Sequence, residues 1–280
     1  MTYKMIVSDL DESLLRTDGS ISPADIKTIK QLQAQGVKFV PNTGRGFASV
    51  QGLLQSIGTY QTADQYVISY NGGAIVENAH DRIIAAHPLP FAVAEAIFRL
   101  GVAHPELGCH IYTLHTVYVF RPTADELAYL HSRGVAYRDW QAHDLSALAA
   151  HAIVKVIFDH PDLAIRQAFA REVAAKVAYP CTVSYSSGRY VEFNPAGIDK
   201  GDAAIALGAH LGIKPAEIIG LGDNLNDLKM LQKVGLGVSV ANGIPAIQQA
   251  ADLVLAVDND HDPITALSAA VFAPFEHAKK

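Results

Sequence analysis

The sequence predicts a doubly wound α/β fold with a mainly parallel core sheet and an α+β segment inserted in mid-chain. Short apolar runs alternate with helical stretches in the first third and again after about residue 195, as a parallel sheet requires. Between these parts, helical stretches are each followed by runs typical of antiparallel hairpins. We therefore expect a core domain formed by residues 1–84 and 191–280 and a cap domain formed by residues 85–190.

The first third begins with an expected strand at 3–9 and a well-marked helix after it. Ser22 can cap this helix, Pro23 suits its first position and Gly36 ends it. The expected elements that follow are a strand at 37–44, a helix at 47–57, a strand at 66–69, a hairpin turn at Asn71-Gly72-Gly73, and strands in AIVEN and RIIAAH.

The inserted segment and the last third are divided in the same way. In the insert, helices are expected at 90–103 and 161–177, before the strand-like runs HIYTLHTVYVFR and TVSYSSGRYVEF, the second with a hairpin signal at Ser187-Gly188. The last third alternates a helix at 200–211, the strand IIGLGD, a helix at 225–233, the strand LGVSV, a helix at 244–250, the strand LVLA and a helix near 261–272.

Composition excludes several classes of protein. With 280 residues, half of them apolar, the chain can bury a sizeable core, and a net charge of -6 without a basic stripe argues against nucleic acid as a partner. No apolar run approaches the ~18 residues of a membrane span, so we expect a cytoplasmic protein with no membrane partner. The two cysteines cannot form a disulfide framework, and the twelve histidines show no HxH or HxxxH spacing, so a zinc site is not expected.

Four polar clusters fall where strands of the expected sheet end. In open α/β sheets, ligands bind outside the carboxyl ends of the strands. Asp9 and Asp11 follow the first strand, Thr43-Gly44-Arg45 follows the second, Lys200 opens a helix, and residues 222–227 read GDNLND. Each cluster alone has an ordinary explanation as a cap, a turn or a surface amine.

Together and in this order, the clusters resemble the signature of the haloacid dehalogenase-like (HAD) hydrolases, and more narrowly the Cof-like phosphatases of subfamily IIB. That signature is DxDGTL, then a hydroxyl residue, a lysine and GDxxND, and the chain offers DLDESL at 9–14, Thr43, Lys200 and GDNLND. The resemblance covers nearly the whole length. It implies a Rossmann-like core sheet and an inserted α+β cap of the C2B type.

The resemblance also implies an activity, that of a Mg²⁺-dependent phosphatase acting on a small phosphorylated metabolite such as a sugar phosphate. It assigns Asp9 as the nucleophile that forms an aspartyl-phosphate, and Asp11 as the acid and base. Asp9, the backbone carbonyl of Asp11, and Asp223 would be the metal ligands, which explains why carboxylates crowd at one strand end. Selectivity would come from the cap.

Further residues take positions from the same resemblance. The phosphoryl group would be held by the amides near Leu10 and Gly44, the hydroxyl of Thr43, Lys200 and Asn226. Asp227 is expected beside Lys200 or a metal-bound water. Arg45 and Asn71 are candidates for substrate contact, with a structural role equally open. Glu12-Ser13 departs from the family's Gly-Thr, so a residue with a Cβ and a charge must make the turn.

Several alternatives stay open at this point. A phosphomutase or phosphotransferase would share the aspartyl-phosphate step, and a HAD-fold binding or regulatory protein would keep the fold with weakened catalysis. A phospho-acceptor resembling a response-regulator receiver also uses acids, a hydroxyl and a lysine, but it is shorter and has no insert. A dinucleotide-binding protein is disfavoured because neither Gly220-Leu-Gly222 nor Gly235-Leu-Gly237 completes GxGxxG.

Overall fold

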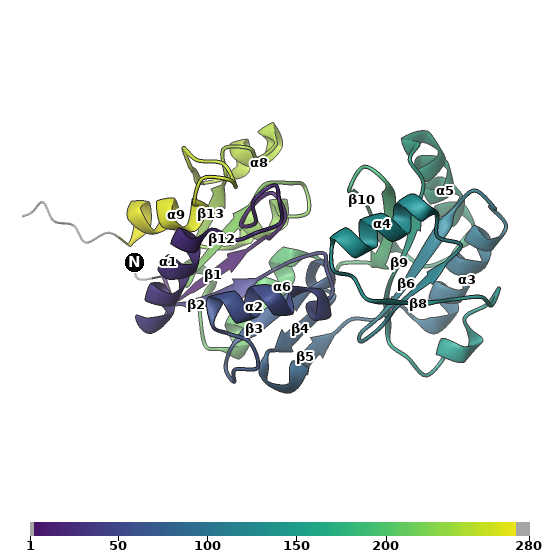
Figure 1. Cartoon of the computed structure of the whole chain (residues 1–280), viewed down its shortest axis with the longest axis horizontal. Coiled ribbons are helices and arrows are strands. Elements are labelled where there is room, and N and C mark those ends of the chain that lie inside the picture. The colour runs from purple at the N-terminus through teal and green to yellow at the C-terminus, as the bar shows by residue number, and fades with distance from the viewer. Residues whose placement is uncertain (1–2, 273–280) are drawn as a thin grey trace, which may run out of the picture. The chain divides into compact units, whose positions relative to one another are not determined.

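The computed structural model describes residues 3–272 and divides them into two compact units (Figure 1). The first unit consists of the chain up to Gly44, of Val50–Ile84 and of the chain from Asp199 onward, and the second of Arg45–Ser49 and Ala85–Ile198. The return to the first unit therefore falls later than the expected residue 191. The reason is that Tyr190–Pro195 is a strand of the second unit's sheet, paired on both sides.

The first unit is built on a five-stranded sheet of order β14-β13-β12-β1-β2, in which every pairing is parallel. The central strands are buried along their whole length, which is why their sequences are continuously apolar. Ser8 at the end of β1 pairs with Leu221 on one side and with Pro41 on the other. The strands are β1 Met5–Ser8, β2 Lys38–Pro41, β12 Ile218–Gly222, β13 Leu236–Ser239 and β14 Leu253–Val254.

Helices of the first unit form two packed groups. Helix α1 packs against α2 and α9, while α7 packs against both α6 and α8. Helix α1 begins as its sequence predicts, because the hydroxyl of Ser22 accepts the N–H of Asp25 at 2.9 Å. The helices are α1 Pro23–Ala34, α2 Gln51–Ile57, α6 Lys200–His210, α7 Leu228–Lys233, α8 Pro245–Ala250 and α9 Pro263–Val271.

A small sheet of order β3-β4-β5 also starts in the first unit. Strands β3 and β4 pair antiparallel across the turn that Asn71-Gly72-Gly73 predicts, and Asn71 takes a positive φ of 55° there. Asn42, just beyond β2, forms a parallel bridge with Ile68 of β3, which links this sheet to the edge of the main one. The strands are β3 Tyr66–Ser69, β4 Ala74–Glu77 and β5 Arg82–Ala86.

The second unit contains a six-stranded sheet of order β10-β11-β9-β6-β7-β8, with helices α3, α4 and α5. Alternate residues of its strands, such as Cys109, Phe158 and Phe193, form an apolar core together with α3 and α5. The elements are α3 Phe91–Val102, β6 Gly108–Thr113, β7 Val117–Phe120, α4 Ala124–Ser132, β8 Tyr137–Asp139, β9 Ile153–Asp159, α5 Leu163–Lys176, β10 Cys181–Ser186 and β11 Tyr190–Pro195.

Short 3₁₀ turns complete the described elements. They lie at Phe47–Val50, Tyr70–Gly72, Ala79–Asp81, Ser146–Leu148 and Pro215–Glu217.

The fold class expected from the sequence is confirmed, with several local corrections. Strands β8 and β9 were not expected from the sequence. Helix α4 was not expected, although Thr123 caps it by accepting the N–H of Glu126 at 3.1 Å. The helix expected at 47–57 starts with a 3₁₀ turn and becomes α-helical only at Gln51. Helix α7 begins at Leu228, because the preceding GDNLND stretch folds into a loop.

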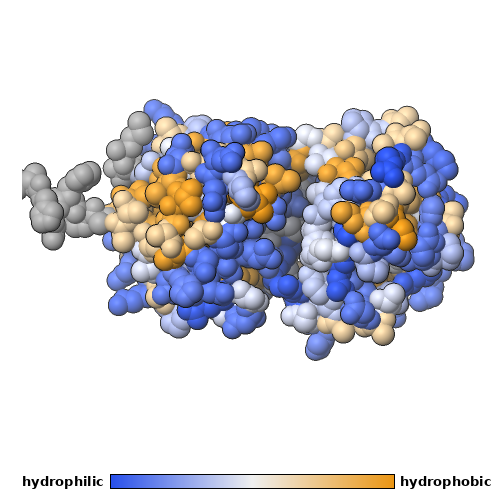
Figure 2. Space-filling model, turned by 90° about the horizontal axis from the view of Figure 1, so that it is seen from above, coloured by the Kyte–Doolittle hydropathy of each residue, from blue (hydrophilic) through white to orange (hydrophobic). Residues whose placement is uncertain are grey.

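The surface is mixed in polarity, and the two cysteines are free. The face seen in Figure 2 mixes hydrophilic and hydrophobic residues on both units. Within residues 3–272, no helix has the length and apolar character that crossing a membrane would need. Cys109 is buried and Cys181 is half-buried, and neither forms a disulfide.

Candidate active site

The site lies at the carboxyl ends of the central strands of the first unit. Asp9 directly follows β1, Asp223 directly follows β12, and Thr43 lies just past β2. The parallel pairing continues past the strand ends, because the N–H of Asp9 donates to the carbonyl of Leu221 at 2.9 Å and that of Asn42 to Ser8 at 2.8 Å. Three segments far apart in the sequence therefore present their side chains at one edge.

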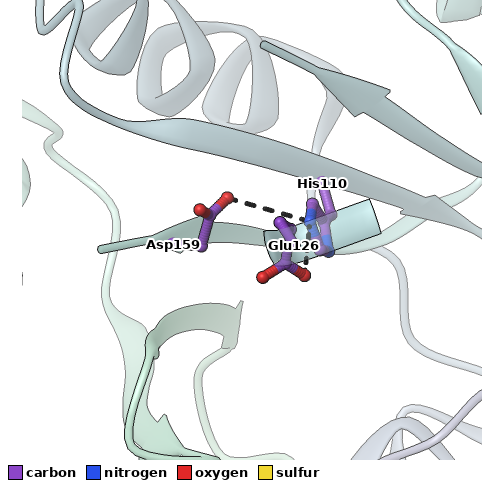
Figure 3. Close-up of side chains that lie close together, drawn as sticks. All are labelled: His110, Glu126 and Asp159. Atoms are coloured by element: carbon purple, nitrogen blue, oxygen red, sulfur yellow. Dashed lines mark ion pairs between the residues drawn. The ribbon is translucent and has the colours of Figure 1, made fainter. Parts of the chain in front are cut away.

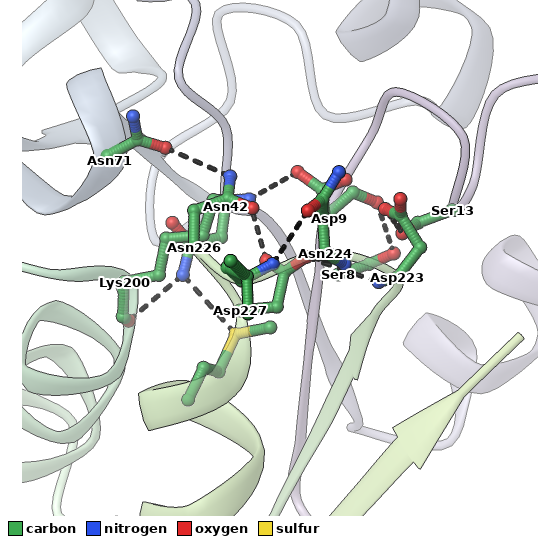
Figure 4. Close-up of polar contacts among 12 residues, drawn as sticks. Ser8, Asp9, Ser13, Asn42, Asn71, Lys200, Asp223, Asn224, Asn226 and Asp227 are labelled. Atoms are coloured by element: carbon green, nitrogen blue, oxygen red, sulfur yellow. Dashed lines mark hydrogen bonds and ion pairs between the residues drawn. The ribbon is translucent and has the colours of Figure 1, made fainter. Parts of the chain in front are cut away.

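Three carboxylates meet at this edge (Figure 4). One oxygen of each of Asp9, Asp223 and Asp227 lies within 4.8 Å of the others, and all three residues are buried. Burial raises the pKa of Asp9 well above its ordinary value, partly offset by the charge of Lys200. Burial, together with the charge of Asp227, also raises the pKa of Asp223, to about 6. The negative charge in the cluster is thus incompletely compensated by the protein alone.

Lys200 supplies the positive charge of the cluster. Its ammonium group is fully buried and donates to Asp9 and, at 2.7 Å, to Asp227 Oδ1. Burial alone would lower the pKa of Lys200, but the charges of Asp227 and Asp9 outweigh it and raise the pKa. The lysine is therefore a permanent cation at neutral pH.

Backbone contacts hold Lys200 in place at the first position of α6. Asp199 caps this helix by accepting the N–H of Asp202 at 2.8 Å. The side-chain amide of Asn42 donates to the carbonyl of Lys200 at 3.0 Å and thereby connects the end of β2 to the start of α6. Asn42 and Ser8 were not singled out from the sequence, although a buried polar residue at the end of an apolar strand is the signal that would have found them.

The loop after β12 is organised by Asp227. Its Oδ2 accepts the N–H groups of Asp223 and Asn224, both at 3.2 Å, while its Oδ1 binds Lys200. Gly222 permits this arrangement, because a Cβ at that position would lie 2.4 Å from the Cβ of Asp227. The spacing of GDxxND thus serves to fold the loop around one carboxylate.

The loop after β1 contains Glu12 and Ser13, which stand where the family pattern has Gly-Thr. The carbonyl of Leu10 accepts the N–H groups of Ser13, Leu14 and Leu15, at 3.3, 3.0 and 2.7 Å, and this tight turn places Glu12 at a φ of 61°. The side chain of Glu12 is exposed to solvent. Ser13 is buried and its hydroxyl donates to Asp223 Oδ1 at 2.7 Å, so it orients a carboxylate of the cluster.

The remaining residues singled out from the sequence differ in their exposure. Leu10 and Thr43 are buried, Asp11 and Gly44 are half-buried, and Asn226 is exposed. The amide of Asn226 donates to Asn71 Oδ1 at 3.4 Å, and a Cβ on Gly44 would lie 3.2 Å from the Asn71 amide atoms. Arg45 belongs to the second unit.

The donor set suits a hard divalent cation. Carboxylate oxygens are the ligands that such cations prefer, and the raised pKa values of Asp9 and Asp223 show that added positive charge would stabilise their ionised forms. The acidic cluster could therefore hold a metal ion beside Lys200.

Comparison with known proteins gives the class to which this fold and site belong. The chain matches the model of the haloacid dehalogenase-like hydrolases over residues 6–266. It belongs to this family, and the expectation of a hydrolytic enzyme is confirmed.

Relatives cover nearly the whole chain. A Haemophilus influenzae protein provisionally named a phosphatase is 29% identical over 261 residues, which are 93% of this chain and 95% of the relative. An HMP-PP phosphatase of Serratia proteamaculans is 28% identical over 258 residues, covering 88% of this chain and 86% of the relative.

Solved structures agree with the fold. A haloacid dehalogenase-like hydrolase from Bacteroides thetaiotaomicron has a TM-score of 0.86 at 23% identity, covering 97% of this chain and 100% of that one. A HAD subclass IIB sugar phosphatase has a TM-score of 0.79 at 18% identity, covering 95% of this chain and 98% of that one. At these identities the likeness is one of fold.

Proposed function

We propose that this protein is a Mg²⁺-dependent phosphatase that hydrolyses a small phosphomonoester, such as a sugar phosphate, through an aspartyl-phosphate on Asp9. The observation that carries the proposal is the meeting of Asp9, Lys200, Asp223 and Asp227 in one buried cluster at the carboxyl edge of the sheet. The names of the relatives support the phosphatase class.

Mg²⁺ fits this cluster because the side-chain atoms that could bind a metal ion, those of Asp9, Asp223 and Asp227, are all carboxylate oxygens. Asp9, Asp223 and the backbone carbonyl of Asp11 would hold Mg²⁺, with Ser13 keeping the carboxylate of Asp223 in orientation. When bound, the ion would neutralise charge on the substrate phosphate and on the carboxylates. Lys200 adds a second positive charge beside Asp9.

Asp9 would act as the nucleophile. A carboxylate oxygen of Asp9 attacks phosphorus, and the bond between phosphorus and the ester oxygen breaks, which leaves the phosphoryl group on Asp9. The contact with Lys200 supports the ionised form of Asp9 that this step requires. The ammonium group of Lys200 also donates to Asp227, so its charge is shared between the two carboxylates and does not neutralise Asp9 alone.

Asp11 would transfer the protons. It is less buried than Asp9 and lies two residues farther along the chain, so it meets solvent more readily. Asp11 protonates the departing alcohol oxygen, and then accepts a proton from the water that attacks the phosphorus of the aspartyl-phosphate. Free phosphate leaves and Asp9 is restored as a carboxylate.

The phosphoryl oxygens would be held by Thr43, by the backbone amides near Leu10 and Gly44, and by Asn226. Thr43 follows β2 beside Asn42, so its position is tied to the sheet and to α6. Such fixed donors lower the barrier because they need no rearrangement as charge develops on phosphorus.

The test is Mg²⁺-dependent phosphate release from a panel of sugar phosphates, nucleotides, pyridoxal phosphate and flavin mononucleotide. We expect the wild-type protein to hydrolyse at least one of them, and Asp9→Asn to be inactive but folded. Asp18→Asn is the matched control, since Asp18 is an exposed aspartate that caps a local turn by accepting the N–H of Ser20. Activity that persists in Asp9→Asn overturns the nucleophile assignment.

Product analysis distinguishes hydrolysis from transfer. A phosphatase releases inorganic phosphate, whereas a phosphomutase or phosphotransferase passes the phosphoryl group from Asp9 to a second hydroxyl. Hydrolysis in water labelled with ¹⁸O should place one labelled oxygen in the released phosphate. A phosphoryl group that appears only on an organic acceptor contradicts the phosphatase assignment.

A further inference from the structure

A second cluster of ionisable side chains lies inside the second unit. One possible ligand atom of each of His110 on β6, Glu126 on α4 and Asp159 on β9 lies within 4.8 Å of the others (Figure 3). His110 is fully buried, and Glu126 and Asp159 are buried as well. The proposed phosphatase mechanism uses none of them.

The cluster lies on the face of the sheet opposite the apolar core. Cys109 and Ile111, the neighbours of His110 along β6, belong to the core formed with α3 and α5, so His110 faces the other way. Glu126 reaches this second face from α4, where it also accepts a hydrogen bond from the hydroxyl of Tyr190 on β11. The cluster therefore connects two strands and a helix that are not adjacent in sequence.

Hydrogen bonding inside the cluster is incomplete. Neither ring nitrogen of His110 makes a hydrogen bond, and Oδ1 of Asp159 has no hydrogen-bonding partner either, although these atoms are buried. A buried polar atom without a partner costs free energy, and such orphans point to an unplaced ligand or ion. His110 Nε2 faces both acids, at 3.3 Å from Glu126 Oε1 and 3.8 Å from Asp159 Oδ1.

The separation of 3.3 Å between His110 Nε2 and Glu126 Oε1 is that of neighbouring ligands around one small cation, and the separation of 3.8 Å to Asp159 Oδ1 is longer. Zinc bonds of about 2.0–2.1 Å in a tetrahedron place neighbouring donor atoms roughly 3.3–3.4 Å apart. Gly108 makes room for the acid, because a Cβ there would lie 2.2 Å from Asp159 Oδ1. Gly108 lies directly opposite Asp159 on the neighbouring strand β6. Because glycine has no side chain, the Asp159 carboxylate has room to lie near His110.

Burial and neighbouring charges shift the pKa values of His110 and Asp159. Burial, reinforced by the charge of Lys155, lowers the pKa of His110 to about 3, so the imidazole is in its neutral, metal-binding form. Lys155 itself is paired with Glu192 at 2.8 Å. Burial and the charge of Glu126 raise the pKa of Asp159 to about 7, and the charge of Arg189 partly offsets this rise.

Outer contacts hold the acid from α4 in orientation. Arg189 donates to Glu126 Oε2 at 3.1 Å, while Tyr190 donates to Oε1. Partners of this kind are typical around metal ligands, where they set the position of the carboxylate and tune its basicity.

We propose that His110, Glu126 and Asp159 form a structural site for a divalent transition metal, with Zn²⁺ the preferred ion. One imidazole nitrogen and two carboxylate oxygens suit Zn²⁺ better than Mg²⁺, which prefers oxygen ligands alone. The ion would link β6, β9 and α4 and thereby stabilise the second unit. This site is separate from the acidic cluster of the first unit, and it does not depend on the proposed phosphatase activity.

The test measures zinc retention by the full chain. The protein is stripped with a chelator, loaded with Zn²⁺, desalted and analysed by inductively coupled plasma mass spectrometry. Asp223→Asn weakens the acidic cluster of the first unit, so zinc retained by this variant reports on the second unit. His104→Gln is the matched control, because His104 also contacts two glutamates, Glu106 and Glu172, but is part-exposed.

We expect about one retained equivalent in the wild type, in Asp223→Asn and in His104→Gln, and its loss in His110→Gln and Glu126→Gln. Zinc should also raise the unfolding temperature of the first three proteins but not of the last two. If His110→Gln does not fold by circular dichroism, Glu126→Gln and Asp159→Asn decide the question. A wild type that retains no zinc, or zinc lost in Asp223→Asn but kept in His110→Gln, overturns the proposal.

Discussion

The ammonium of Lys200 lies 2.7 Å from Asp227 Oδ1, with both side chains fully buried. A buried ion pair costs desolvation free energy, and removing one partner leaves the other charge uncompensated. Asp227 also binds the backbone of its own loop, so this one carboxylate sets the positions of the lysine and of Asp223 together.

Asp227→Asn should therefore affect both stability and catalysis. We expect the free energy of unfolding to fall by about 1.5–3 kcal/mol, because Lys200 loses one charged hydrogen-bond partner and the loop loses its acceptor, while Asp9 still pairs with Lys200. We also expect kcat/KM to fall by on the order of 10-fold to 100-fold as Lys200 and Asp223 lose their orientation. Urea unfolding and phosphate release measure the two effects.

Asp202→Asn provides the control for that variant. Asp202 lies on α6, the helix that carries Lys200. Like Asp227, it pairs with a lysine, Lys233, at 2.6 Å, but both of these side chains are exposed. An exposed pair contributes only about 0–1 kcal/mol. Equal losses in Asp202→Asn and Asp227→Asn would contradict the role given to burial.

Ser13→Ala should weaken metal affinity more than it changes the fold. The hydroxyl of Ser13 donates to Asp223 Oδ1 at 2.7 Å and lowers the pKa of that carboxyl against the effect of burial. Without it, we expect the Mg²⁺ concentration for half-maximal activity to rise by about 10-fold. Ser13→Thr retains the hydroxyl and should stay near the wild type; an unchanged Mg²⁺ dependence in Ser13→Ala would count against this role.

Glu12→Gly should stabilise the protein. Glu12 has a φ of 61°, a conformation that costs residues with a Cβ about 1–2 kcal/mol and costs glycine little. Part of this gain is lost to the greater freedom of glycine in the unfolded chain, so we expect a net increase of roughly 0.5–1 kcal/mol in the free energy of unfolding. Glu12→Ala removes the same charge without relieving the backbone, and a similar gain in that variant would refute the explanation.

Asp25 should make stability depend on pH. It is a buried residue of α1, and its Oδ1 accepts the N–H of Thr265 on α9 at 2.8 Å. Burial raises the pKa of Asp25, so its carboxyl binds a proton more tightly in the folded state than in the unfolded one. Its contribution to stability is complete below the unfolded pKa and is lost as the pH rises through the folded pKa.

Comparison of the wild type with Asp25→Asn isolates this effect. We expect the free energy of unfolding of the wild type, relative to the variant, to decrease as the pH rises above about 4, the ordinary pKa of an aspartate. Urea unfolding at several pH values measures it. A difference between the two proteins that does not change with pH would show that Asp25 is not the group responsible.

The core of the fold was predictable because its signals are local. Apolar runs such as Met5–Ser8 need burial on both faces, and the cap at Ser22 starts α1 at the expected residue. Helix α4 was missed although Thr123 and Gly134 mark its ends, because only two of its residues, Glu126 and Leu130, are buried and its apolar pattern is weak.

Local sequence was less informative about how side chains meet. The return of the chain to the first unit was expected too early, since strand pairing of Tyr190–Pro195 with β9 is a long-range event. Spacing rules also do not bring His110, Glu126 and Asp159 together, because such rules detect ligands one or two turns apart, whereas these three residues come from different elements.

The sequence by itself determined the alternation of strands and helices, the polar strand ends and the order of the family motifs, because these depend on neighbours along the chain. Only the tertiary structure decided that Lys200 binds Asp9 and Asp227, that Ser13 reaches Asp223, and that His110 is buried among acids. The physical reason is that these contacts depend on sheet register and on the exclusion of water, which arise only when distant segments pack together.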